Sequence, residues 1–76
     1  MKISLSEKEI EMLTDKEIDF NQNHEYTEDE AFELLEQVRD VEVFYSQDLK
    51  HNEASYQKYI QYGDLADKIQ DIISEE

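Results

Sequence analysis

The sequence predicts a small all-α protein, a three-helix bundle with helices at about residues 7–16, 28–46 and 53–74. Two observations carry this prediction. Apolar residues recur at intervals of three and four positions, which places them on one face of a helix. The chain also has one glycine and no proline in 76 residues, so little in it would interrupt a helix. A chain of this length forms one domain with a modest core, and we expect residues 1–76 to be that domain.

The first helix is predicted from a capping box at its start. In a capping box, a hydroxyl before the helix and a carboxylate three positions later bind each other's backbone N–H groups, and Ser6 and Glu9 have this spacing. Leu5 and Ile10 occupy the positions of a hydrophobic staple, which fixes how the chain enters a helix. These signals predict a helix from residue 7, with Ile10 and Leu13 facing the core.

Residues 17–26 lose the helical spacing. Ile18 and Phe20 are separated by Asp19, and a run of polar residues follows. We therefore expect an irregular connector at 17–26 whose two apolar side chains pack under the bundle.

The second helix is predicted to begin after another capping box, formed by Thr27 and Glu30. Its apolar residues form one stripe about 120° wide: Ala31, Leu34, Leu35, Val38, Val41 and Tyr45. Glu42 falls inside this stripe, where an unpaired carboxylate would be costly. We expect it to reach toward solvent or to pair with Lys58 or Lys68.

The third helix has one main apolar face, made of Tyr59, Tyr62, Leu65, Ala66, Ile69, Ile72 and Ile73. Gly63 lies inside it, and indicates either a close helix crossing or a bend. The turn before this helix offers Asp48 or Asn52 as the N-cap. Short links between three helices favour an up-down-up arrangement.

The composition restricts the partners. Twenty-one acidic residues against seven Lys and Arg residues give a net charge of −14, which repels nucleic acid phosphates and anionic lipid surfaces. We therefore expect a basic protein as partner, with no direct nucleic acid and no membrane contact. The sequence has no cysteine, no signal-peptide pattern and no apolar run near the roughly 20 residues that span a bilayer, which favours the cytoplasm.

Catalytic and metal-binding patterns are weak. The sequence has no nucleophile elbow and no glycine-rich phosphate loop. His24 and His51 fall in predicted loops, where a lone histidine is usually exposed and without a role. Acidic residues alternate from Asp15 to Asp19 as a calcium loop begins, but Phe20 stands where that loop needs glycine. We expect no enzyme, no catalytic residues, no metal site and no cofactor.

The second helix carries acidic residues at the spacing i, i+4, i+7 and i+11: Asp29, Glu33, Glu36 and Asp40. This spacing places the four side chains within about 60° of one another, opposite the apolar stripe. Phe44 lies beside this face and off the stripe, where it could serve as an exposed apolar anchor. We predict that these five residues bind a partner. An acidic helix face that is merely solvated would show the same pattern.

The stretch from Tyr26 to Leu35 resembles the start of a helix in the small acidic immunity proteins that protect bacteria from nuclease colicins. The resemblance covers about ten residues and consists mostly of the capping box. Those proteins are compact and helical and bind a basic nuclease through an acidic surface, so the resemblance implies that kind of fold and partner. The chain lacks their Tyr-Tyr-Pro element because it has no proline. No site residues are transferred.

The leading interpretation is a non-catalytic module that docks on a basic protein and inhibits it, as an immunity protein or inhibitor does. A nucleic-acid mimic directed at a DNA-binding protein is the first alternative, because carboxylates spaced along a helix approximate the phosphates of a strand. A structural subunit of a helical homo-oligomer, such as a homodimer, is the second alternative. It follows from the broad apolar faces of the second and third helices.

Overall fold

A computed structural model of the chain describes residues 1–47 and 53–75, and the regular secondary structure within these ranges is helical. The helices are α1 (Glu7–Asp15), α2 (Glu28–Ser46) and α3 (Glu53–Glu75). The prediction of a small all-α three-helix bundle is confirmed. The ends of these helices lie within one residue of their predicted positions.

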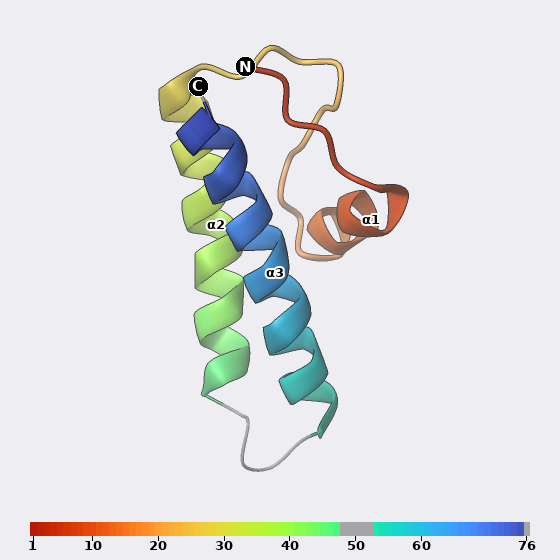
Figure 1. Cartoon of the computed structure of the whole chain (residues 1–76). Coiled ribbons are helices and arrows are strands. Elements are labelled where there is room, and N and C mark those ends of the chain that lie inside the picture. The colour runs from red at the N-terminus through yellow and green to blue at the C-terminus, as the bar shows by residue number, and fades with distance from the viewer. Residues whose placement is uncertain (48–52, 76) are drawn as a thin grey trace.

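α2 and α3 run antiparallel, side by side, along the length of the molecule (Figure 1). Their buried side chains follow the predicted stripes: Ala31, Leu34, Leu35 and Val38 on α2, and Tyr62, Leu65, Ala66, Ile69 and Ile73 on α3. Burial of this apolar area is the main term that holds the two helices together, at about 25 cal/mol per Å². The predicted N-caps of α3, Asp48 and Asn52, lie outside the described residues.

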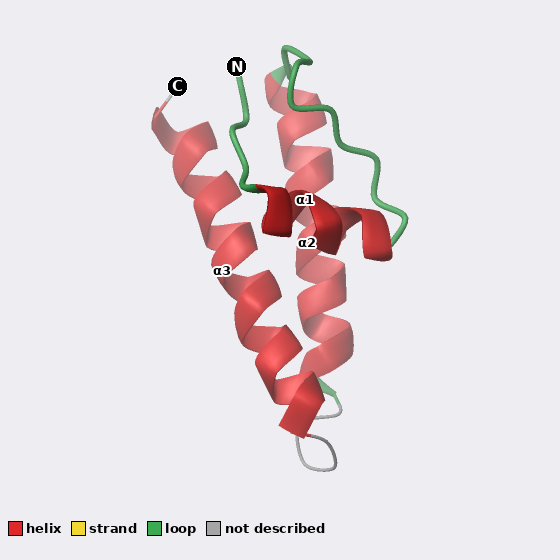
Figure 2. Cartoon of the chain, turned by 90° about the vertical axis from the view of Figure 1, so that its right-hand side faces the viewer, coloured by secondary structure: helices red, strands yellow, loops and turns green. Residues whose placement is uncertain are grey.

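α1 lies across the α2–α3 pair instead of running alongside it (Figures 1 and 2). The expected up-down-up arrangement is therefore wrong for the first helix. With nine residues, α1 is about 13 Å long, too short to cover the pair lengthwise. It crosses the pair and buries Met12 and Leu13. The chain segments before and after α1 follow the long direction of the pair instead.

The first residues of the chain pair with the end of the connector. The Met1 ammonium donates to the Tyr26 carbonyl oxygen at 2.6 Å, and the Tyr26 N–H donates to the Met1 carbonyl oxygen at 2.8 Å. Ile3 and Leu5, which follow, are buried in the core. Residues 1–26, which we call the N-terminal region, thus fold back on themselves and against the helical pair.

The first helix ends in a Schellman turn, in which two N–H groups beyond the helix bind carbonyls of its last turn. The Glu17 N–H donates to Thr14 at 3.0 Å, and the Ile18 N–H donates to Leu13 at 2.9 Å. Glu17 has a φ of 58°, in the left-handed region that favours glycine. The turn sends Ile18 into the core, and Phe20 packs against the core as predicted.

Both predicted capping boxes form. The Ser6 hydroxyl and the Glu9 carboxylate bind each other's N–H groups at 3.2 and 2.8 Å, and Thr27 and Glu30 do the same at 3.2 and 3.0 Å. Glu9 also accepts from Lys68 of α3 at 2.7 Å. Burial alone would raise the pKa of Glu9, but the hydrogen bonds from Lys68 and Ser6 outweigh it and lower that pKa.

Gly63 allows a side chain of α2 to lie directly on α3. A Cβ at this position would come within 2.7 Å of Glu42 Oε2, so the glycine leaves room for this carboxylate. The expected pairing of Glu42 with Lys58 or Lys68 is wrong. Its partner is Arg39, whose Nη1 donates to Glu42 Oε1 at 3.1 Å. Arg39 stands three residues earlier on the same helix, where its side chain reaches the carboxylate directly.

Candidate functional site

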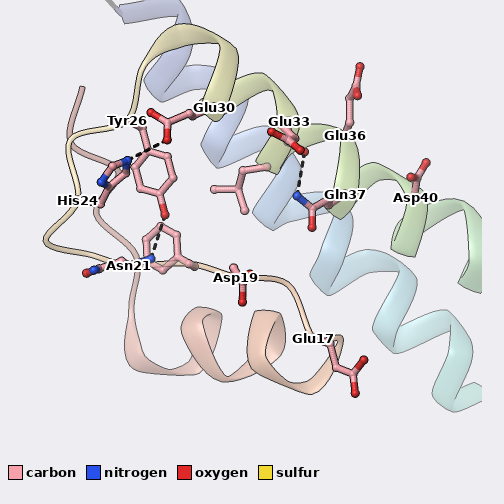
Figure 3. A pocket seen from close by; sticks show the side chains of 12 residues that line it. Glu17, Asp19, Asn21, His24, Tyr26, Glu30, Glu33, Glu36, Gln37 and Asp40 are labelled. Carbon is pink, nitrogen blue, oxygen red and sulfur yellow. Dashed lines mark hydrogen bonds and ion pairs between the residues drawn. The ribbon is translucent and has the colours of Figure 1, made fainter.

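A groove of about 790 Å³ lies between the connector and α2 (Figure 3). We call it the acidic groove because six of its lining residues carry carboxylates: Glu17, Asp19, Glu30, Glu33, Glu36 and Asp40. The other lining residues are Phe20, Asn21, His24, Tyr26, Leu34 and Gln37. Two segments that are separate in the sequence thus form its two walls.

Tyr26 organises the connector wall. Its ring stacks on Phe20 with 5.8 Å between centroids and 11° between planes, and the His24 ring meets it edge-on at 4.7 Å. The Tyr26 hydroxyl accepts a hydrogen bond from the Asn21 N–H at 2.9 Å (Figure 3). These contacts hold an irregular segment in one conformation, so that it can form a wall.

Glu30 lines the groove, but its carboxylate is already engaged. Oε1 accepts from the Thr27 N–H, and Oε2 lies 3.0 Å from His24 Nε2. The hydrogen bond from Thr27, followed by that from His24, lowers the pKa of Glu30. Glu30 therefore serves the start of α2. His24, which the sequence predicts to have no role, ties the connector to that helix.

The other five carboxylates of the groove form no ion pair with a residue of the described chain: Glu17, Asp19, Glu33, Glu36 and Asp40. All five residues are exposed. Within residues 1–47 and 53–75, no lysine or arginine lines the groove. Like charges at neighbouring positions of a helix repel by a few tenths of a kcal/mol per pair. A cationic ligand in the groove would relieve this repulsion.

The structure brings together three of the five predicted partner-binding residues. Glu33, Glu36 and Asp40 line the acidic groove. Asp29 is exposed but lies outside the lining. Phe44 is 64% exposed and lines a smaller cleft of about 320 Å³, which shares Asp40 with the groove. That these residues bind a partner stays a prediction.

The small cleft at Phe44 is lined in part by a lysine that does not belong to α2, so the sequence pattern of α2 does not predict it. Lys16, from the end of α1, lines it together with Val41. The Lys16 ammonium lies 4.7 Å from the centroid of the Tyr45 ring, a cation–π contact, and the Phe44 ring meets Tyr45 edge-on. The acidic face of α2 thus ends at an apolar cleft that is bordered by a positive charge.

Sequence reasoning missed the connector's share of the site. Helical spacing places residues on one face of one helix, whereas Glu17 and Asp19 reach the groove through the turn that ends α1. One signal could have found them. Both flank Ile18, which is predicted to pack under the bundle, so their carboxylates are expected at the surface of the bundle.

Within 1–47 and 53–75, no group of three His, Asp or Glu side chains could hold a metal ion. None of the helices there is long and apolar enough to cross a membrane. His51 lies outside the described residues.

We find no match between this chain and a protein-family model, a curated protein or a solved structure. The resemblance of the Tyr26–Leu35 stretch to immunity proteins therefore rests on its capping box and its charge.

Proposed function

We propose that this protein is a non-catalytic binding module of the cytoplasm, which docks on a basic partner protein and inhibits it. The observation that carries the proposal is the set of five carboxylates that line the acidic groove and have no ionic partner in the described chain. The net charge of −14 steers a basic surface toward the protein. The groove then gives that attraction a fixed place. If the partner uses its basic surface to bind an anionic substrate, docking covers that surface and blocks the substrate.

Phe44 supplies the apolar part of the proposed contact. Its ring is 64% exposed at the end of the acidic face, next to Asp40. Aromatic residues that become desolvated on binding contribute more than rim charges, which mostly raise the association rate. We therefore assign steering to Glu33 and Glu36, and close contact to Phe44.

The test is capture of partners from native lysate by the full chain at low and high salt, with identification by mass spectrometry. The tag belongs at the C-terminus, because the Met1 ammonium is hydrogen-bonded. The Glu33→Lys/Glu36→Lys variant removes two groove carboxylates. The Glu11→Lys/Asp71→Lys variant makes the same charge change at exposed positions outside the groove lining.

A basic protein that is recovered by the wild type and by the Glu11→Lys/Asp71→Lys control, but lost with the groove variant, supports the proposal. Equal loss with both variants would show that only net charge matters and would contradict it. If the recovered protein binds DNA and DNA competes for it, the partner is instead the target of a nucleic-acid mimic.

A structural subunit of a homo-oligomer is a second candidate function, favoured by large apolar side chains that stay exposed. They are Phe32, Val43 and Phe44 on α2, and Tyr56 and Ile60 on α3, each between 39% and 64% exposed. Sedimentation equilibrium separates this function from the first. A dimeric mass that becomes monomeric in Val43→Ser/Ile60→Ser supports it, and a wild-type monomer of 9.1 kDa excludes it.

A further inference from the structure

The N-terminal region covers one face of the α2–α3 pair, and no segment of the described chain covers the opposite face (Figures 1 and 2). On α2, Val41 lines the cleft at the end of α1, and Val43, two positions later, projects about 200° away from it. On α3, the Tyr62 hydroxyl donates to the Met12 carbonyl oxygen of α1, and Ile60 stands two positions before that tyrosine. Val43 and Ile60 therefore lie on the uncovered face.

We call this surface the open face, and one ion pair crosses it between the two helices. Arg39 Nη2 donates to Asp67 Oδ1 at 3.3 Å. The large apolar side chains of the face are each between 39% and 54% exposed. Whole helical turns separate those on the same helix, so they share a side. The open face consists of Phe32, Arg39 and Val43 on α2, and Tyr56, Ile60 and Asp67 on α3.

The carboxylates at the open face have a cation beside them, unlike those of the acidic groove. Arg39, the only arginine of the chain, donates to Glu42 Oε1 and to Asp67 Oδ1. Five groove carboxylates, by contrast, form no ion pair in the described chain. Two copies of a chain with a net charge of −14 repel each other least where their carboxylates are paired. Paired carboxylates and exposed apolar side chains thus make the open face suitable for contact with a second copy.

The side chains that α2 and α3 present on the open face match in level along the pair. The ion pair between the helices fixes one level. A second is fixed by Glu42, whose Oε2 lies 2.7 Å from where a Cβ of Gly63 would be. Because the helices run antiparallel, Val43, one position after Glu42, and Ile60, three positions before Gly63, lie within one helical turn of the same level. At matching levels, α2 therefore offers a cation and an apolar side chain, and α3 offers an anion and an apolar side chain.

A two-fold rotation about an axis parallel to the helices makes this surface complementary to itself. Such a rotation moves nothing along its axis, so it sets α2 of one copy on α3 of the other at an unchanged level. Arg39 then faces Asp67 of the second copy, and Val43 faces Ile60 of the second copy. The guanidinium has five N–H donors, so it can bind this second aspartate without leaving the first. An axis across the helices would instead place Arg39 against its own copy, where like charges repel.

We propose that the chain forms a two-fold symmetric dimer through the open face, in which two α2–α3 pairs make a four-helix bundle and each Arg39 binds Asp67 of the second copy. This inference rests on the second candidate function, the homo-oligomer, and names its interface. α2 has 19 residues, about 28 Å, and two packed helices are about 20 Å wide, so each copy offers roughly 600 Å². The total of about 1,200 Å² is at the lower end of specific interfaces.

The test measures the dimer dissociation constant of the full chain by sedimentation equilibrium. Arg39→Asp and Asp67→Arg each bring like charges together across the interface, so each variant alone should dimerise about tenfold more weakly than the wild type, or worse. Mixed in equal amounts, the two variants bring opposite charges to both contacts. The mixture should therefore form a heterodimer, which native mass spectrometry distinguishes by mass from the two homodimers. A gain on mixing cannot come from a change in fold, because the monomers are the same.

Net charge alone predicts a different order. Arg39→Asp changes the net charge from −14 to −16, and Asp67→Arg changes it to −12. If repulsion between whole molecules decided association, the Asp67→Arg homodimer would be the tightest of all. That order would overturn the proposed contact.

A further variant tests the apolar part of the interface. Val43→Ser/Ile60→Ser removes four apolar side chains from the dimer and should weaken it on the order of a hundredfold. Phe44→Ser is the matched control, because Phe44 is 64% exposed but lines the cleft beside α1. It should change the dissociation constant by less than about twofold. Circular dichroism verifies that the helices of each variant remain.

The outcomes separate this inference from the functions proposed above. A wild-type monomer at every concentration would overturn the dimer and the homo-oligomer candidate, and would leave docking on a basic partner untouched. A dimer weakened by Phe44→Ser but not by Val43→Ser/Ile60→Ser would overturn the open face and keep the homo-oligomer. Rising salt should tighten the dimer, because it screens the repulsion between two acidic copies, whereas it should weaken docking on a basic protein. A dimer that loosens with salt would contradict the proposal.

Discussion

The α2–α3 pair and the N-terminal region satisfy their backbones in different ways. In the pair, regular helices satisfy the N–H and carbonyl groups internally, and an apolar stripe on each helix provides the attraction. In the N-terminal region, nine residues are helical and the rest depend on individual partners, such as Met1 with Tyr26 and Tyr26 with Asn21. Burial of apolar area is the main attraction within the pair, which also has an ion pair between Arg39 of α2 and Asp67 of α3 at 3.3 Å. The N-terminal region depends more on individual hydrogen bonds. The two should respond differently to substitution.

The largest expected effect is on the core of the pair. Leu65 is 1% exposed, and Leu65→Ala should lower the free energy of unfolding by about 2–5 kcal/mol, through lost burial and the cavity that remains. Urea denaturation followed by far-ultraviolet circular dichroism measures it. Ile60→Ala is the control, since Ile60 is 41% exposed and its truncation should cost less than about 1 kcal/mol. Similar losses in the two variants would contradict the assignment of the core.

A smaller and more local effect is expected in the N-terminal region. Tyr26→Phe keeps the stacked ring but removes the hydroxyl that accepts from the Asn21 N–H, at a cost of about 1 kcal/mol. Amide hydrogen exchange should accelerate around residue 21 and change little in α2 and α3. Tyr56→Phe, at a ring that is 48% exposed, serves as the control and should leave both unchanged. Uniform acceleration along the chain would show that the two regions open as one unit.

The junction of the two regions should show a still smaller, pH-dependent effect. Because its hydrogen bonds lower the pKa of Glu30, that carboxylate contributes stability above the unfolded-state pKa of about 4.3, and the contribution is lost as pH falls through the lower folded-state value. Glu30→Gln should therefore be less stable than the wild type at neutral pH, with a difference that vanishes in acid. Thermal melts across this range test it. Glu11→Gln, which changes an exposed carboxylate on α1, is melted alongside as the control.

The smallest net effect is expected where Glu42 of α2 lies against Gly63 of α3. Alanine at position 63 gains about 0.5–1 kcal/mol of helix stability over glycine, but its Cβ would displace Glu42 from a position 2.7 Å away. Gly63→Ala alone should therefore change stability little. In a Glu42→Ala background the full gain should appear, so the double-mutant cycle should show coupling. Additive effects would mean that Glu42 does not lie against Gly63.

Most of the helical pair was predictable because apolar residues recur at helical spacing along both helices. The stripes containing Val38 and Ile69 recur over several turns, and the Thr27 capping box marks where α2 begins. The sequence also indicates the partner of Glu42. Arg39 stands three positions before it, a spacing at which side chains on a helix meet.

The N-terminal region was less predictable because its decisive contacts occur once each. The spacing of apolar residues does not predict that α1 crosses the pair, because its nine residues could pack in several directions. The end of α1 lacks the glycine that usually marks a Schellman turn, as Glu17 occupies the left-handed position. The connector wall of the groove therefore could not be placed from spacing, whereas the α2 wall of Glu33, Glu36 and Asp40 could.

The acidic groove is formed by both regions, so it exists only while the connector stays packed against α2. Any local unfolding that releases the connector removes one wall and abolishes the site, while α2 and α3 stay folded. A ligand that requires both walls therefore binds only the form in which the connector is packed against α2. By mass action, its binding raises the free energy of this local opening by RT ln(1 + [L]/Kd). Slower hydrogen exchange of the connector amides on binding would thus report that the groove is occupied. The ligand need not contact the backbone of the connector for this effect to appear.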